Sequence, residues 1–116
     1  MASLEGTRWI LASGISLPQD AVIVRPTVAF DRETVSGSTG CNRYGGACAV
    51  DGPSLTLGPL ASTLMACAPP ADLIEREFVE ALARVARWRV EDGELVLGDV
   101  HGVELLRFTR EEPAGP

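Results

Sequence analysis

Short stretches in which apolar and polar residues alternate make up most of this chain. The clearest covers residues 21–30 and places four apolar side chains on one face: Val22, Val24, Val28 and Phe30. Alternation with a period of two predicts a half-buried β-strand. Pro26 falls on the apolar side of the stretch. Because proline has no N–H, it predicts either an edge strand or a break in the strand.

Similar stretches, separated by turn residues, predict further strands before and after this one. Asp51-Gly52-Pro53, Gly58-Pro59, Asp92-Gly93 and residues 99–102 read as turns. The strands between these turns and the earlier breaks are predicted at 6–13, 35–50 with an internal corner, 54–57, 60–65 and three places after residue 86, the last at 103–109. In that last strand Leu105-Leu106 interrupts the alternation, which predicts a bulge or burial on both faces.

One segment, about residues 73–86, has the period of an α-helix. Its apolar side chains form one stripe, opposite a face rich in arginine and glutamate: Ile74, Phe78, Ala81, Leu82 and Val85. Asp72 before the stripe predicts an N-cap, and Glu75 three residues later completes a capping box. With Glu77 and Glu80, Glu75 is expected on a solvated helix face.

These elements predict an α+β domain that is mostly β. We expect an antiparallel sheet or partial barrel of about eight short strands around the single helix. The chain has 116 residues, 46% of them hydrophobic, which suits one domain with its own core. We assign residues 1–110 to that domain and 111–116 to a polar C-terminal tail.

The segment from Ser36 to Gly46 holds four glycines, a cysteine and an asparagine between two predicted strands. Glycine admits positive φ and close backbone approach, and asparagine tolerates the left-handed region. The segment therefore predicts a tightly folded strand-turn-strand corner.

Charge and composition exclude several classes of function. The formal net charge is −6, which argues against nucleic acid and anionic membranes as partners. All ten basic residues are arginine, so lysine Schiff-base and P-loop chemistry are excluded. No stretch reaches the roughly 18 apolar residues of a membrane span. As written, the N-terminus has no signal-peptide core and no lipid-accepting cysteine, which predicts a cytoplasmic protein; an exported precursor would make it periplasmic, envelope-bound or secreted.

Two motifs give the chain a family resemblance. Gly-Cys-Asn-Arg-Tyr at residues 40–44 is followed about 20 residues later by Thr-x-Met-Ala-Cys at 63–67, with a tryptophan-containing first strand before them and Leu105 to Phe108 after them. In this the chain closely resembles the META domain family of HslJ-like heat-shock proteins. The family motif residues that it carries are Gly37, Gly40, Cys41, Asn42, Arg43, Tyr44, Thr63, Met65 and Cys67.

The resemblance implies a small fold in which an antiparallel sheet wraps around a helix. It also implies kinship with envelope lipoproteins, with stress-induced proteins linked to novobiocin resistance, and with secreted or virulence-associated proteins. No enzymatic activity is characteristic of such domains. Cys41 and Cys67 match the family's cysteines, and they form either a disulfide or a pair of buried thiols. Asn42, Arg43 and Tyr44 either serve the turn and its packing or line a site for a peptide or small ligand.

Catalytic and metal chemistry find little support in the sequence. The spacings of Cys41, Cys48, Cys67 and His101 match no zinc module, so no metal and no cofactor are expected. A nucleophilic cysteine needs a base, and His101, the single histidine, lies in a predicted exposed turn.

We therefore expect a non-enzymatic, stress-related or envelope-associated module that binds a protein or a small apolar ligand. One alternative is a redox or hydrolytic enzyme that uses Cys41 or Cys67, and another is a structural accessory domain. Thiolate reactivity near neutral pH separates the enzyme from the binding module.

Overall fold

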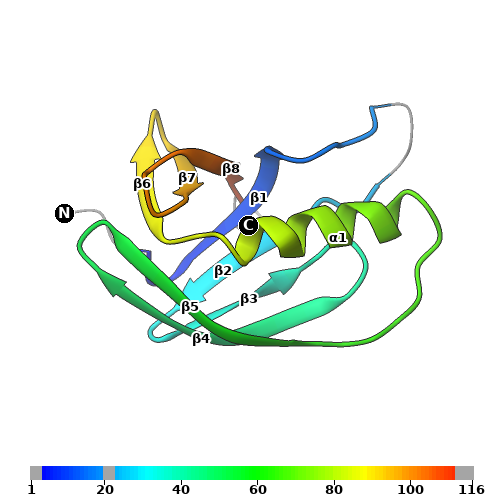
Figure 1. The fold of residues 1–116 in the computed structure, drawn as a ribbon, viewed down its shortest axis with the longest axis horizontal. Coiled ribbons are helices and arrows are strands. Elements are labelled where there is room, and N and C mark those ends of the chain that lie inside the picture. Colours follow the sequence, from blue (N-terminus) through cyan, green and yellow to red (C-terminus); the bar gives the residue numbers. More distant parts are fainter. Residues whose placement is uncertain (1–3, 20–22, 112–116) are drawn as a thin grey trace, which may run out of the picture.

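A computed structural model describes residues 4–19 and 23–111, which contain eight strands and one helix. These are β1 (Thr7–Ser13), β2 (Thr27–Asp31), β3 (Thr34–Ser38), β4 (Arg43–Asp51), β5 (Ser54–Ser62), α1 (Ala71–Leu82), β6 (Arg87–Glu91), β7 (Glu94–Gly98) and β8 (Glu104–Arg110). Each strand is antiparallel to its neighbour in the chain, and β8 returns to pair with β1 (Figure 1). The predicted fold class, mostly β with a single helix, is confirmed.

The ring of strands is closed unevenly. β4 and β5 pair from Asp51↔Ser54 to Tyr44↔Ser62, whereas β5 and β6 share the single pair Ser54↔Arg87. From there α1 crosses the concave side of the sheet (Figure 1). The ring of Phe78 on this helix lies edge-on to Tyr44 and Phe108, with centroids 6.0 and 6.4 Å away. The helix thus buries its apolar stripe against strands from both sides of the ring.

The helix has the predicted stripe but different ends. Ile74, Phe78 and Leu82 are buried as expected, and Val85 joins the core from a turn beyond the end of α1. The predicted capping box is wrong, because Pro70 occupies the N-cap and makes no side-chain cap bond. The carboxylate of Asp72 accepts the N–H of the next residue, Leu73, and Glu75 instead accepts from Asn42.

The alternating stretch at 21–30 forms a strand only in its second half. β2 begins at Thr27, so Pro26 marks a break in the alternation. Val24, predicted on the buried face, is 64% exposed. Val22 lies outside the described residues.

Two irregularities in the strands test the turn and bulge predictions. Gly58-Pro59 does not form the predicted turn: β5 continues through it to Ser62, and the extra residue is absorbed as a bulge opposite Ala47. Proline is tolerated there because a bulge already disrupts the ladder. The predicted bulge at Leu105-Leu106 is confirmed, since Leu97 pairs with Leu106 and Gly98 with Glu104.

The ends of the described chain lie together. The N–H of Glu111 donates to the carbonyl of Arg8 over 2.9 Å, next to the pairing of β1 with β8. Residues 112–116 of the predicted tail lie outside the described residues. Within residues 4–19 and 23–111, no helix is both long and apolar enough to cross a membrane.

A cluster of charged side chains covers part of β6, β7 and β8. The guanidinium of Arg107 bonds to Glu91, Glu94 and Glu104 at 3.1, 3.0 and 2.8 Å, and Arg89 also pairs with Glu91. Hydrogen bonds from Arg89 and Arg107 lower the pKa of Glu91, and a hydrogen bond from Arg107 lowers that of Glu104. The cluster therefore favours the ionised carboxylates.

This cluster predicts a loss of stability in acid. A carboxylate with a lowered folded-state pKa stabilises the fold above its unfolded pKa, and that contribution disappears as pH falls through the folded value. We expect Arg107→Gln to unfold more easily than wild type near pH 7, with the difference shrinking below about pH 4 as the glutamates protonate. Urea midpoints of both proteins between pH 7 and pH 2.5 measure this; a pH-independent difference would contradict it.

Candidate functional site

The glycine corner between β3 and β4 is organised by Thr39. Its N–H donates to the carbonyl of Asn42 over 2.8 Å, and its hydroxyl oxygen accepts the N–H groups of Cys41 and Asn42 at 3.2 and 2.8 Å. Thr39 is 1% exposed. The corner is thus a closed turn whose polar groups bond to one another, as the glycine and asparagine content predicts.

The side chain of Asn42 connects this corner to the rest of the molecule through hydrogen bonds. Its Oδ1 accepts the hydroxyl of Thr63 at 2.8 Å and the N–H of Met65 at 2.7 Å. Its Nδ2 donates to the carbonyl of Met65 at 3.1 Å and to Oε1 of Glu75 at 2.9 Å. The side chain is 4% exposed. One buried amide therefore links the corner, the segment after β5 and the N-terminal half of α1.

Glu75 is the member of this network that the sequence did not place here. The same Oε1 that accepts from Asn42 also accepts the hydroxyl of Thr39 over 2.6 Å. The expectation of a solvated face is therefore wrong for this residue. Its spacing from Asp72 fits a capping box equally well, so only the packing of the helix on the corner reveals its role.

A disulfide joins Cys41 to Cys67, with the two Cα atoms 6.0 Å apart. It lies beside the Asn42 bonds and ties the same two segments together. We call the six residues that connect the corner, the segment after β5 and α1 the clasp: Thr39, Cys41, Asn42, Thr63, Cys67 and Glu75. The clasp fixes where the chain leaves β5 and where the helix begins.

The remaining motif residues shape or support the clasp. A Cβ on Gly37 would lie 2.2 Å from the carbonyl oxygen of Thr27, so only glycine allows this strand contact. Tyr44 is buried, its hydroxyl donates to that same carbonyl over 2.7 Å, and burial raises its pKa. The N–H of Arg43 donates to Thr63 Oγ1 over 3.1 Å, while its side chain is exposed. Met65 uses its backbone in the clasp and leaves its side chain 61% exposed.

Gly40 needs both its φ and its missing side chain. Its φ is +97°, and a Cβ would lie 3.0 Å from Cγ2 of Ile74 and 3.1 Å from the carbonyl of Val24. We expect Gly40→Ala to lower the free energy of unfolding by about 2–3 kcal/mol. Gly93→Ala is the matched control, because its φ is +78° with nothing within 4 Å, so it costs only about 1 kcal/mol of backbone strain. Urea denaturation measures the free energy of unfolding of both variants. If both lose the same amount, the contact between residue 40 and α1 does not contribute to the loss.

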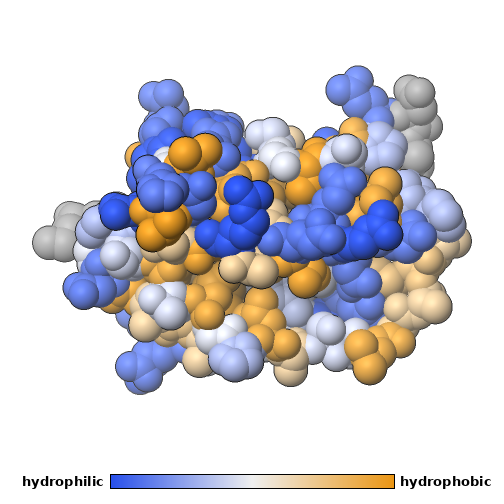
Figure 2. Space-filling model, in the orientation of Figure 1, coloured by the Kyte–Doolittle hydropathy of each residue, from blue (hydrophilic) through white to orange (hydrophobic). Residues whose placement is uncertain are grey.

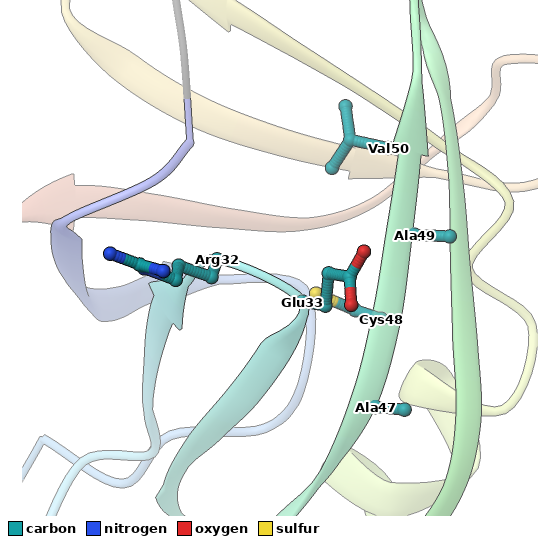
Figure 3. Close-up of a pocket in the computed structure, with 6 residues that line it drawn as sticks. All are labelled: Arg32, Glu33, Ala47, Cys48, Ala49 and Val50. Carbon is teal, nitrogen blue, oxygen red and sulfur yellow. The ribbon is translucent and has the colours of Figure 1, made fainter.

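Cys48 lies outside the clasp, in a hollow of about 490 Å³ beside β4. Arg32, Glu33, Ala47, Ala49 and Val50 line the hollow with it, and the Cys48 and Glu33 side chains lie on the same side of the strand (Figure 3). Burial, with a further contribution from the Glu33 carboxylate, raises the pKa of the thiol. The environment thus favours the protonated thiol, the opposite of what activates a cysteine nucleophile.

His101 occupies the turn between β7 and β8, as predicted. Its N–H donates to Oδ1 of Asp99 over 2.9 Å, and the residue is exposed. In the part of the chain that the structure describes, no three or more histidine, cysteine, aspartate and glutamate side chains gather as metal ligands would. Cys41 and Cys67 are bonded to each other, and neither Cys48 nor His101 joins them in such a group.

A strand ring with one crossing helix, clasped at the helix start by an asparagine network and a disulfide, defines a class of small β-rich domain. The META domain model matches residues 2–112, and the chain belongs to the META domain family. An NMR structure of a protein from Burkholderia xenovorans is 28% identical, with a TM-score of 0.77, over 95% of this chain and 85% of that one. A second NMR structure is 26% identical with a TM-score of 0.68, over 94% of this chain and 95% of that one. No curated protein matches the chain.

Proposed function

We propose that this protein is a non-enzymatic binding module that recognises a protein or a small apolar ligand through the surface around the clasp. The observation that carries the proposal is a group of exposed apolar side chains at this end of the molecule. Leu64 is 94% exposed, Val24 64%, Met65 61% and Leu73 39%. Exposed apolar groups that gather in one place mark interaction surfaces more often than isolated ones do.

The clasp brings these four side chains to the same end. The backbone of Met65 bonds to Asn42, and Leu64 precedes it in the same segment. Gly40 lies close to both Ile74, the neighbour of Leu73, and the carbonyl of Val24. Figure 2 shows apolar atoms at the end of the molecule where the chain passes from β5 to α1. The clasp therefore acts as a rigid support for an apolar surface.

The alternative of a cysteine-dependent enzyme has weaker support. Cys41 and Cys67 are bonded to each other, so neither presents a thiolate, and the raised pKa of Cys48 disfavours one there. Four exposed apolar side chains at one end favour a surface that binds a partner over a structural accessory domain. These features favour the binding module.

The cell compartment and the stress connection belong to the same proposal. Disulfides persist mainly in oxidising compartments, so the bridge between Cys41 and Cys67 favours an envelope or extracellular site of action. The link to stress and to envelope proteins rests on the family alone.

A paired comparison tests the proposal. The wild type, a Leu64→Ser/Met65→Ser variant and a Val100→Ser/Val103→Ser control would be incubated with envelope and cytosolic fractions and with a panel of fatty acids and aromatic probes. The control residues are similarly exposed, at 61% and 59%, but flank the turn between β7 and β8. We expect binding by the wild type and the control and its loss in the first variant. Equal binding by all three, or alkylation of Cys41 or Cys67 without prior reduction, would contradict the proposal.

A further inference from the structure

The outer edge of β5 lacks a partner strand over most of its length. Every other neighbouring pair in the ring shares at least three residue pairs, whereas β5 meets β6 only at Ser54↔Arg87. Beyond Leu55, within residues 4–19 and 23–111, β4 is the only strand that pairs with β5. The edge of β5 that faces away from β4 is therefore open from Thr56 to Ser62.

The ladder phase shows which backbone groups this edge offers. The N–H of Leu55 donates to the carbonyl of Ala86, so it points away from β4. Leu55, Leu57, Leu60 and Ser62 face alternate residues of β4, namely Val50, Cys48, Gly46 and Tyr44, because the bulge absorbs the extra residue. The backbone N–H and C=O groups of all four therefore point in the same direction, away from β4. The N–H and C=O groups of Leu57, Leu60 and Ser62 point outward, ready to bond to an extended backbone.

Helix α1 runs past this edge and is held at both ends. Beyond its last turn, Ala86 bonds to Leu55, and in its N-terminal half Glu75 bonds to Asn42. Because residues three and four apart share a helix side, Val79 and Ala83 lie on the same flank as Glu75. Val79 is 45% exposed, while Leu57 and Leu60 are partly buried against the core. The edge and the helix flank thus offer backbone hydrogen bonds beside apolar side chains.

We propose that an extended peptide segment of a partner protein adds to β5 as a further strand and rests its side chains on this flank of α1. Strand addition is an established way for a sheet edge to bind peptides, with backbone bonds for affinity and side-chain contacts for selectivity. The inference rests on the proposed binding function, names its partner class and extends its site from the clasp, at Thr63, along the adjoining edge of β5.

Charge indicates what kind of peptide fits. From Ser54 to Ala71 the chain carries no charged residue, and the first charge after it is the exposed Asp72. The whole chain carries a formal charge of −6. The matching segment is therefore apolar and β-branched in its middle, with arginine or lysine at the end that lies beside Asp72. A second copy of this domain would bring its own ring and helix against α1. A single extended peptide is much narrower and fits better beside the helix.

A displayed library of random 12-residue peptides, selected on the disulfide-bonded protein, tests this proposal. We expect the enriched peptides to combine alternating apolar residues with a basic end. A synthetic copy of one should slow amide hydrogen exchange at Leu57, Leu60 and Ser62, and N-methylation of its alternate backbone nitrogens should weaken binding at least tenfold. No enrichment above an unrelated domain, or undiminished binding after methylation in either phase, would overturn the proposal.

Three variants locate the site. Ser62→Pro removes an outward N–H and Val79→Glu places a charge on the helix flank; each should weaken peptide binding at least tenfold. Val100→Glu is the matched control, since Val100 is also exposed, at 61% against 45%, but lies in the turn between β7 and β8. Circular dichroism and thermal melting establish that each variant is folded. If binding depends on Leu64 and Met65 but not on Val79, or protects no edge amide, the edge proposal fails while the binding function stands. Concentration-dependent dimers that protect the edge amides without peptide would instead assign the edge to a second copy.

Discussion

Asn42→Ala is expected to destabilise the protein by about 3–5 kcal/mol, the largest effect of any single substitution in the clasp. Five hydrogen bonds of the amide are lost, to Sγ of Cys41, to Thr63, to Glu75 and, twice, to the backbone of Met65. The backbone groups of Met65 and the carboxylate of Glu75 then lose partners in a site that Asn42 now keeps from water. Urea denaturation of the two proteins measures the loss.

Two further variants show that the hydrogen bonds cause the effect. Asn42→Asp keeps the shape but turns a donor into an acceptor that faces the Glu75 carboxylate. It should be at least as unstable as Asn42→Ala at pH 7 and should recover below about pH 5, where the two carboxyl groups can share a proton. Glu75→Gln keeps an acceptor and should cost about 1 kcal/mol or less. Equal stability of Asn42→Asp at pH 7 and pH 4 would contradict this account.

Removing the disulfide is the second change with a large expected effect. The bridge spans a sequence separation of 26 residues, and closing such a loop stabilises the folded state by roughly 3–4 kcal/mol on the chain-entropy model. We expect Cys41→Ala/Cys67→Ala to lose about this amount in urea denaturation, and the wild type to lose a similar amount when reduced. Cys48→Ala is the matched control, because it removes a thiol without opening a loop.

Thiol titration supplies an independent readout of the bridge. The sequence contains three cysteines, so the unfolded, unreduced protein should show one reactive thiol, from Cys48, and three after reduction. Three thiols before reduction would mean that the oxidised pair does not form.

Local sequence patterns predict the helix and most of the strands, but they do not predict features that depend on contacts between distant parts of the chain. The stripe from Ile74 to Val85 predicts the helix because its spacing repeats with the helical period, whatever the partner. Gly58-Pro59 reads as a turn because the same two residues suit turns and bulges, and only pairing with β4 distinguishes them. Val24 alternates correctly yet lies exposed, because the Pro26 break separates it from β2.

The sequence predicts which residues belong to the candidate site better than it predicts the bonds between them. The glycine corner and the second motif point to Asn42, Cys41 and Cys67 because these residues belong to the motifs on which the family resemblance rests. Thr39 is one residue among several in the corner, and the helical pattern predicts Glu75 on a solvated face. Their bonds join positions 36 residues apart in the chain, and no local period contains that information.

The pairing of β1 with β8 gives the domain a single point of attachment. The backbone contact between Arg8 and Glu111 leaves both described ends of the chain emerging from the same strand pair. A neighbouring sequence on either side therefore departs from one place, and short linkers could seat the domain within a loop of another protein without stretching either chain. The clasp and the open edge of β5 belong to other parts of the ring, so attachment there leaves the proposed binding surfaces uncovered.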